Sequence, residues 1–314
     1  MQILVTDGLT PLAIEALSRE HEVTAVELNP AELLERISSF HALIVRSRTK
    51  VTKEVILRGK QLRVIGRSGV GVDNIDVTAA TAQRVVVVYA PTGSTVSVAE
   101  LAIGHMLSLS RMIPQADRSV RAGKWEKGRF VGHELQGKTL GLIGSGRIGA
   151  EVARRAQAFG MQVIAFDPYL KPEDASAREI RLSTLDAVLA TSDFISVHAA
   201  LTEETRGMID ASAFFAMKET ACLINCARGE IVNEEDLSEA LRSRRIRGAA
   251  LDVYQEEPPT HSPLLDLENV IFTPHIGAST EEAQERTSQL VAQEVLLALS
   301  GKKPNHAVNP EVLG

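Results

Sequence analysis

The sequence predicts an α/β protein with two Rossmann-like, doubly wound parallel-sheet domains, the first of them discontinuous. Short apolar runs alternate with helical patterns along all 314 residues, and this βαβ rhythm is typical of parallel sheets with right-handed crossovers. Hydrophobic residues make up 44% of the chain but aromatic residues only 4%, so the core must be aliphatic, as in buried parallel strands. The length also exceeds what a single hydrophobic core normally serves.

The first part of the chain contains four candidate strands and the helices between them. The strands are the apolar runs at Ile3–Thr6, Ala42–Arg46, Arg63–Ile65 and Val85–Tyr89. Amphipathic patterns at Pro11–Ser18 and Pro30–Ile37 predict two connecting helices.

A second set of six strands follows Gly137. These strands are expected at Thr139–Ile143, Gln162–Phe166, Phe194–Val197, Ala221–Asn225, Gly248–Val253 and Val270–Phe272. Helical patterns separate most of them, and the one at Leu237–Arg242 follows Asn233 as a candidate N-cap and three acidic residues. Six parallel strands with intervening helices are typical of a dinucleotide-binding domain.

The order of the elements predicts how the chain divides. A helical pattern over Ser97–Ile113 joins the two sets of strands, and a final helix is expected over Thr280–Leu299. We therefore expect a substrate-binding domain formed by residues 1–93 and 285–314, and a dinucleotide-binding domain formed by residues 94–284.

Composition and charge argue against several function classes. The formal net charge is −6, which indicates no nucleic-acid footprint, and the basic run at residues 242–247 is typical of a solvated helix end. The N-terminus reads as a strand rather than a signal peptide, and no run approaches the roughly 20 apolar residues that span a bilayer. Cys222 and Cys226 would lie roughly 13 Å apart on one strand, too far for a disulfide. We expect reduced thiols, no metal site and a cytoplasmic protein.

A glycine-rich turn links a strand to a helix in the second domain. Gly144 permits the tight turn, Gly146 lets the backbone approach a pyrophosphate, and Gly149 lets the helix pack on the strand. A pyrophosphate would lie at the helix N-terminus, where free N–H groups and the dipole favour an anion, and Arg147 is either a phosphate contact or a solvated residue. Asp167 ends the next strand, where its carboxylate would bind the adenosine ribose and repel a 2′-phosphate. The pattern therefore predicts NAD as the cofactor.

Three polar residues each follow a strand of the same domain. They are Arg228, Glu257 and His275. The carboxyl ends of parallel strands meet at one edge of the sheet, which is where ligands bind in this type of fold. A histidine serves as base or acid for a hydroxyl near neutral pH, a carboxylate fixes its tautomer, and an arginine binds a carboxylate as a fork. The trio predicts hydride transfer at a carbon that bears oxygen.

Two further strand ends carry polar residues. Asp252 is either a buried turn acid or a partner for the nicotinamide carboxamide, and we favour the second interpretation. His198 is an alternative to His275, ranked second because no glycine turn follows it and no carboxylate comes from a neighbouring strand end.

Several runs, in order along nearly the whole chain, resemble the D-isomer-specific 2-hydroxyacid dehydrogenases. These runs are GRSGVGVDNID, GSGRIG, NCARGE, ALDVYQEEPP and TPHIGAST. The resemblance implies that Arg228, Glu257 and His275 are the catalytic trio. It also implies that NAD is lined by Gly144, Gly146, Arg147, Ile148, Gly149, Asp167, Ala199, Cys226, Asp252 and Gly277.

Within the family, the runs ARGEIVNEEDL, HIGASTEEAQ and RSRTKVT resemble members that oxidise D-3-phosphoglycerate to 3-phosphohydroxypyruvate in serine biosynthesis. The resemblance implies that Arg46 and Arg67 face a phosphate or carboxylate, and that the backbone of Ser68 and Gly69 binds the carboxylate. Arg46 is alternatively a surface charge at the edge of the sheet. Glyoxylate, hydroxypyruvate or D-lactate reduction on the same scaffold is a close alternative function, and an NAD-sensing corepressor is an alternative from another class.

The resemblance further implies a homodimer or higher homo-oligomer. Its interface would use the helix at Ser97–Ile113 and the loop at Gly123–Phe130, and Lys127 would reach the substrate of a neighbouring subunit. The sequence ends soon after the last helix, so we do not expect the extra C-terminal regulatory domain of some relatives.

Three places depart from the family pattern. Val70 and Ser94 stand where the family often has a Thr or Ser-like residue and an Asn, respectively, and Ala199 and Ala200 replace a polar residue and a proline. These departures weaken specific cofactor and substrate contacts but leave the chemistry in place.

Overall fold

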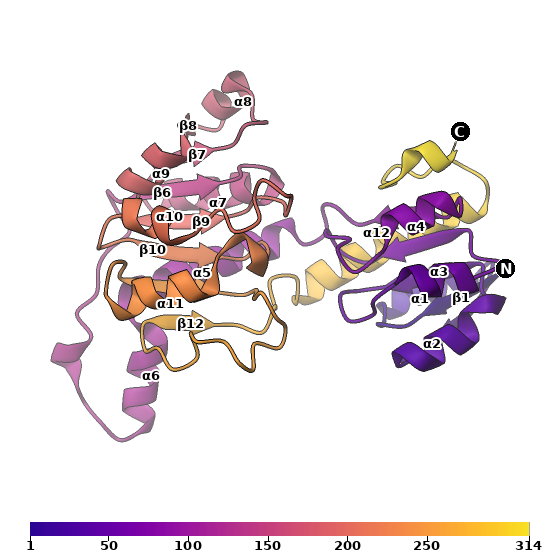
Figure 1. Cartoon of the computed structure of the whole chain (residues 1–314), viewed down its shortest axis with the longest axis horizontal. Coiled ribbons are helices and arrows are strands. Elements are labelled where there is room, and N and C mark those ends of the chain that lie inside the picture. Colours follow the sequence, from indigo (N-terminus) through magenta and orange to yellow (C-terminus); the bar gives the residue numbers. More distant parts are fainter. Residues whose placement is uncertain (314) are drawn as a thin grey trace. The chain divides into compact units, whose positions relative to one another are not determined.

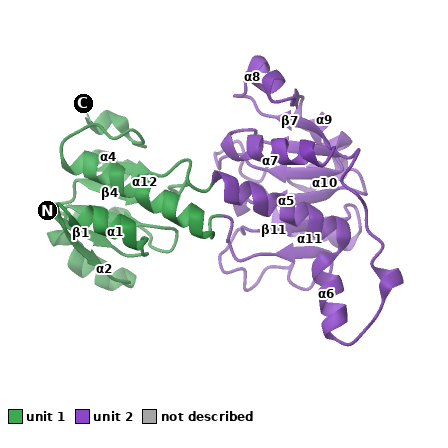
Figure 2. Cartoon of the chain, turned by 180° about the vertical axis from the view of Figure 1, so that it is seen from behind, with its two compact units in different colours: residues 1–94, 278–314 green, residues 95–277 purple. Residues whose placement is uncertain are grey.

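The structure, a computed structural model, describes residues 1–313, which form two compact units (Figure 2). The first unit holds residues 1–94 and the segment from Ala278 to the end of the described chain, and the second holds Thr95–Gly277. The chain returns to the first unit at Ala278 rather than at residue 285, because the whole of helix α12 (Glu281–Leu299) packs on the first unit.

The first unit is built on a five-stranded parallel sheet with the order β2-β1-β3-β4-β5 (Figure 1). Its strands are β1 (Gln2–Val5), β2 (Glu22–Ala25), β3 (Ala42–Val45), β4 (Val64–Arg67) and β5 (Val86–Tyr89). The strand order reverses between β1 and β3, which is the position where ligands bind to sheets of this order. Residues that follow these two strands therefore lie at a ligand-binding edge.

Helices cover both faces of this sheet. They are α1 (Pro11–Ser18), α2 (Pro30–Arg36), η1 (Ile37–Ser39), α3 (Lys53–Arg58), α4 (Val77–Ala82), α12 and η4 (Pro310–Leu313). Helices α1 and α12 bury residues such as Leu17 and Val291 on one face, and α2, α3 and α4 pack on the other. Gly66 in β4 allows α12 to approach closely, since a Cβ there would lie 2.7 Å from Val295 Cγ2.

The second unit is built on a seven-stranded parallel sheet with the order β12-β11-β10-β9-β6-β7-β8. Its strands are β6 (Thr139–Ile143), β7 (Gln162–Phe166), β8 (Arg181–Leu182), β9 (Phe194–Val197), β10 (Cys222–Asn225), β11 (Gly248–Leu251) and β12 (Val270–Phe272). This is the strand order of dinucleotide-binding domains with one strand added beyond β11. The order reverses between β6 and β9.

Helices also cover both faces of the second sheet. They are α5 (Thr95–Arg111), α6 (Ile113–Arg121), η2 (Lys127–Arg129), α7 (Arg147–Ala158), α8 (Pro172–Ala177), α9 (Leu185–Thr191), α10 (Ala211–Ala216), η3 (Gly229–Ile231) and α11 (Glu234–Arg242). Residues such as Met106 of α5 and Val152 of α7 pack on one face, and Phe214 of α10 and Leu237 of α11 on the other. Helix α6 and the segment after it extend away from the sheet (Figure 1).

The fold class expected from the sequence is confirmed, and the structure adds two strands that the sequence pattern did not indicate. Both β2 and β8 are edge strands; β2 has no buried residue and β8 has only two residues. Within residues 1–313, no single helix is long and apolar enough to cross a membrane, although the bent pair α5 and α6 passes on length and composition alone. The same residues contain no group of three or more His, Cys, Asp or Glu side chains placed to hold a metal ion.

Candidate functional site

The turn after β6 has the geometry of a dinucleotide-binding loop. Gly144 has a left-handed φ of 86°, and a Cβ there would lie 2.7 Å from the amide nitrogen of Ala199 beyond β9. A Cβ on Gly149 would lie 2.4 Å from the Gly144 carbonyl oxygen, so helix and turn pack closely. Gly146 instead borders open space, and no side chain caps the N-terminus of α7 that follows it. Free N–H groups beside an open backbone fit a pyrophosphate.

Asp167 follows β7 and lies beside this turn. Its Oδ2 accepts a hydrogen bond from Ser145 N at 2.7 Å, and its Oδ1 accepts from Tyr169 N at 2.9 Å and Leu170 N at 3.1 Å. Arg178, which lies in no recognisable sequence motif, donates to Ser145 O at 3.2 Å. A carboxylate and a guanidinium therefore both border the glycine-rich turn.

Two of the three residues predicted to be catalytic are in direct contact at the carboxyl edge of the second sheet. His275 Nδ1 lies 2.8 Å from Glu257 Oε2 and 3.1 Å from Oε1. Burial raises the pKa of Glu257, but the hydrogen bond and charge of His275, with the Tyr254 amide and the charge of Arg228, outweigh burial and hold that pKa below its usual value. Glu257 is therefore ionised near neutral pH, and its contact with Nδ1 leaves Nε2 of the imidazole for a reacting hydroxyl.

Arg228 reaches the same edge from the end of β10. Asn225 shapes this turn, because its Oδ1 accepts a hydrogen bond from Ala227 N at 3.0 Å and its Nδ2 donates to Arg228 O at 2.9 Å. Arg228 Nη1 donates to Ala227 O at 2.6 Å. The charge of Arg228 acts on Glu257, so the structure brings the three predicted residues together.

His275 lies in a turn that other residues must hold in place. Its φ of 53° is left-handed, a conformation that costs an L-residue about 1–2 kcal/mol. The buried Asp252 carboxylate accepts hydrogen bonds from Ile276 N and Gly277 N, both at 2.8 Å. Thr273 Oγ1 donates to the same carboxylate at 2.6 Å. Asp252 thus binds the chain on both sides of the histidine.

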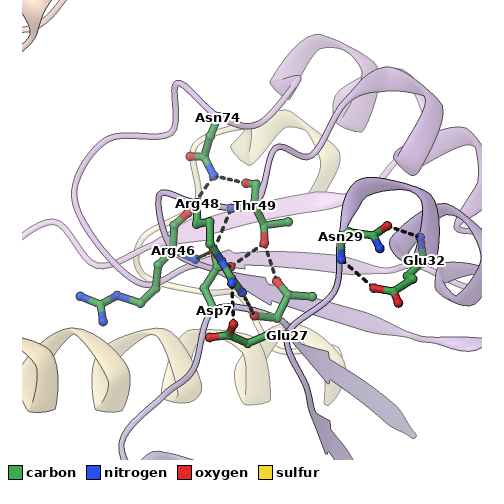
Figure 3. Close-up of polar contacts among 9 residues, drawn as sticks. Asp7, Glu27, Asn29, Glu32, Arg46, Arg48, Thr49 and Asn74 are labelled. Carbon is green, nitrogen blue, oxygen red and sulfur yellow. Dashed lines mark hydrogen bonds and ion pairs between the residues drawn. The ribbon is translucent and has the colours of Figure 1, made fainter. Parts of the chain in front are cut away.

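In the first unit, the loop that carries Arg46 lies at the carboxyl end of β3, beside β1 (Figure 3). The Asp7 carboxylate accepts hydrogen bonds from Arg46 N at 2.7 Å, Thr49 N at 3.1 Å and Thr49 Oγ1 at 2.5 Å. Asn74 Nδ2 donates to Arg46 O at 2.8 Å and Thr49 O at 2.7 Å, and Arg48 pairs with Asp7. The Arg46 backbone is therefore fixed, while its side chain points away from this network (Figure 3).

Arg67, Ser68 and Gly69 lie at the end of the neighbouring strand β4. The Arg67 guanidinium folds over Gly69, where a Cβ would lie 1.4 Å from Nη1, so a larger residue at position 69 would displace this guanidinium. Ser68 is buried, and its Oγ has no hydrogen-bond partner among residues 1–313. These residues share the carboxyl edge of the sheet with Arg46, because β3 and β4 are paired in parallel.

Comparisons with known proteins identify the family. Residues 103–277 match the D-isomer specific 2-hydroxyacid dehydrogenase, NAD binding domain. The chain belongs to the D-isomer specific 2-hydroxyacid dehydrogenases. A curated relative, the D-3-phosphoglycerate dehydrogenase of Methanocaldococcus jannaschii, is 49% identical over 311 residues, which are 98% of this chain and 59% of the relative. The chain thus spans less than two thirds of the length of the curated relatives it matches.

Solved structures of the family share the fold of the whole described chain. The TT0316 protein from Thermus thermophilus is 37% identical, with a TM-score of 0.91 over 98% of this chain and 100% of that protein. A glyoxylate reductase from Paecilomyes thermophila is 30% identical, with a TM-score of 0.90 over 99% of each chain. The second unit is the NAD-binding domain of this dehydrogenase family, and NAD is its cofactor.

The other predicted cofactor residues lie around the same edge of the second sheet. Arg147 is exposed at the start of α7, and Ile148 after it is half-buried. Ala199 lies directly against Gly144, and Cys226 is a buried free thiol after β10. Burial, with the charge of Asp252, raises the pKa of the Cys226 thiol above its usual range, so this thiol is neutral.

His198, the alternative to His275, has different surroundings. Its Nε2 lies 2.8 Å from Ser196 Oγ, and burial lowers its pKa to about 4. The ring is therefore uncharged near neutral pH, and no carboxylate in residues 1–313 lies within hydrogen-bond distance of it. The geometry favours His275 as the acid or base.

Two residues that fix the loops of Glu257 and His275 carried no distinct sequence signal. Tyr254 Oη donates to Thr273 O at 2.8 Å and links the loops of Glu257 and His275. Glu234 stood out in the sequence only as an acid near a helix start. In the structure it is buried, and its carboxylate accepts hydrogen bonds from Gln255 N at 2.7 Å and Ser262 Oγ at 2.6 Å.

Proposed function

We propose that this chain is an NAD-dependent dehydrogenase that oxidises D-3-phosphoglycerate to 3-phosphohydroxypyruvate. The observation that carries the proposal is the 2.8 Å contact between His275 and Glu257 at the carboxyl edge of an NAD-binding sheet. Two observations support this substrate. Curated relatives with 43–49% identity are named D-3-phosphoglycerate dehydrogenase, and the Arg46 guanidinium has no hydrogen bond or ion pair within residues 1–313.

The side chains of His275, Glu257 and Arg228 would act on the hydroxyl proton and the carboxylate of the substrate. His275 Nε2 takes the proton of the C2 hydroxyl during oxidation and returns it during reduction, while Glu257 holds Nδ1 and stabilises the protonated ring. Arg228 binds the substrate carboxylate and polarises the oxygen on C2. NAD, when bound, accepts the hydride that leaves C2.

The remaining predicted residues would bind ligands rather than react. Gly146 and the start of α7 hold the pyrophosphate, and Asp167 holds the adenosine ribose. In the first unit, the guanidinium groups of Arg46 and Arg67 bind a phosphate, and their planar fork suits that anion.

We also propose that two chains form a homodimer through α5 and the extended segment that follows it. Trp125 is 84% exposed and Val131 is 76% exposed, and α6 adds the exposed Ile113 and Val120. Large apolar side chains gathered on one exposed segment are typical of a protein interface.

Initial rates on a panel of acids test the substrate. We expect 3-phosphohydroxypyruvate with NADH, and D-3-phosphoglycerate with NAD, to give higher kcat/KM than hydroxypyruvate, glyoxylate and pyruvate. The R46A variant should lower kcat/KM for the phosphorylated pair by about tenfold or more, since hydrogen bonds to charged groups contribute about 1.5–3 kcal/mol. The K50A variant, which removes an exposed lysine nearby, is the matched control and should change little.

Other outcomes of the panel would contradict specific parts of the proposal. Higher kcat/KM for the unphosphorylated acids would show that Arg46 and Arg67 do not form a phosphate site, and would favour a glyoxylate or D-lactate type of reductase. Tight NADH binding without turnover of any acid would favour an NAD-sensing binding protein.

A further inference from the structure

We propose that His105, a buried histidine of α5, is a positioning residue for His275. It donates a hydrogen bond to Thr273, and Thr273 and Asp252 in turn hold the turn that presents His275. The expected effect on turnover rests on the proposed function. The hydrogen bonds themselves do not depend on which substrate is bound.

His105 makes one polar contact with the segment that carries His275. Its side chain is 3% exposed, and its Nε2 lies 3.2 Å from Thr273 Oγ1. Its helical neighbours on the same buried face, Ala102 and Met106, are apolar. A leucine would fill such a position without the cost of burying a polar ring, so the hydrogen bond distinguishes the histidine from a packing residue.

The direction of each hydrogen bond follows from the number of protons available. The Asp252 carboxylate can only accept hydrogen bonds. Thr273 therefore donates its single hydroxyl proton to Asp252 Oδ1, at a distance of 2.6 Å. Thr273 Oγ1 must then accept from His105 Nε2, which fixes the ring as the tautomer with its proton on Nε2. Burial lowers the pKa of His105 and the charge of Asp252 only partly opposes this, so the ring is neutral.

The chain of hydrogen bonds from His105 ends on the Asp252 carboxylate, which also holds the backbone around His275. The Asp252 carboxylate accepts hydrogen bonds from the Thr273 hydroxyl and from the amides of Ile276 and Gly277. These three contacts lie on both sides of His275 in the sequence. Helix α5 also holds the far end of the turn, because Ser97 Oγ donates to Gly277 O at 2.5 Å.

Gly277 leaves little room for this turn to shift. A Cβ there would lie 3.0 Å from Asp252 Oδ2 and 3.2 Å from a methyl carbon of Val98 in α5. The left-handed conformation of His275 therefore persists because its neighbours are fixed, and part of that restraint comes from His105.

The loss of the His105 donor has a specific structural consequence. Thr273 Oγ1 would keep its bond to Asp252 but lose the partner that orients it, and buried polar groups left without partners are costly. The turn would then open more often, and His275 would spend less time at the position fixed by Glu257.

Three variants test this inference, with one matched control. H105L removes the donor and keeps a similar volume, H105Q keeps a donor amide nitrogen, and T273V removes the hydroxyl that links His105 to Asp252. S110A is the control, because Ser110 is also a buried polar residue of α5 and its Oγ has no partner in residues 1–313. The measurements are kcat and KM on the acid turned over fastest, NADH affinity by fluorescence, and amide hydrogen exchange at Ile276 and Gly277.

We expect H105L to lower kcat by about three- to tenfold, the range that one neutral hydrogen bond supports, while KM and NADH affinity stay nearly unchanged. Exchange at Ile276 and Gly277 should become faster. H105Q should restore most of the lost kcat. The double variant H105L/T273V should have the same kcat as T273V alone, because both substitutions break the same chain of hydrogen bonds. S110A should match the wild type in all these measurements.

Two results would overturn the inference. One is an H105L variant with a lower unfolding temperature but wild-type kcat and wild-type exchange at Ile276 and Gly277, which would make His105 a packing residue. The other is an H105Q variant as impaired as H105L. Exchange needs no substrate, so faster exchange in H105L supports the positioning role even if no acid is turned over, and only the proposed function would then be lost.

Discussion

His275 and Glu257 show how opposing physical effects set the charge of one residue. The Glu257 side chain is 40% exposed, and its partial burial alone would raise its pKa. The hydrogen bond and charge of His275 outweigh this effect and lower the pKa of Glu257, so the carboxylate stays ionised. Glu256 is adjacent in the sequence and also exposed, but it makes no hydrogen bond or ion pair in the part of the chain that the structure describes.

The E257Q variant tests this charge at the scale of the residue. We expect kcat to fall by about tenfold or more in both directions, since a hydrogen bond to a charged group contributes about 1.5–3 kcal/mol. The loss follows because glutamine keeps the shape of the side chain but removes the negative charge that faces Nδ1 while Nε2 carries the transferred proton. E256Q is the control, and an E257Q variant with wild-type kcat would show that Glu257 does not act on the histidine.

At the scale of elements, the connection from β6 to α7 combines two glycines that serve different purposes. Gly149 lies against the backbone of Gly144, so it controls how closely the helix packs on the turn. Gly146 borders open space, so it affects the apo fold little and leaves room for a ligand.

The G146A and G149A variants separate these two purposes. Both should weaken NADH binding by about tenfold or more, equivalent to about 1.4 kcal/mol, in a fluorescence titration. Only G149A should also lower the thermal unfolding midpoint, because overpacking costs about 1–3 kcal/mol. If G146A binds NADH as the wild type does, the pyrophosphate does not lie at the start of α7.

At the scale of the whole molecule, the exposed apolar segment predicts association of two chains. The chain mass is 34.0 kDa, and light scattering after size exclusion should give about twice that value for a dimer. The W125A variant should dissociate at higher protein concentration than the wild type, because large aromatic side chains dominate interface energies. L12A, which removes an exposed leucine from α1, is the control. A wild-type mass of one chain at all concentrations would contradict the dimer.

Much of the fold and of the candidate site was predictable because it is encoded by residues close together in the sequence. The aliphatic runs of the central strands, the glycine pattern after β6 and the polar residues after strand ends are all local signals. The edge strands β2 and β8 were missed for the same reason, since neither has an apolar run that marks burial.

The sequence by itself determined the fold class, the cofactor loop and a short set of candidate acids and bases. Only the tertiary structure showed that His275 contacts a carboxylate and that His198, among the described residues, does not, although both follow a strand. It also placed His105 within hydrogen-bond distance of Thr273, which lies 168 residues further along the chain. The physical reason is that a hydrogen bond between distant residues depends on how packed elements aim their side chains, and no local pattern of residue types encodes that direction.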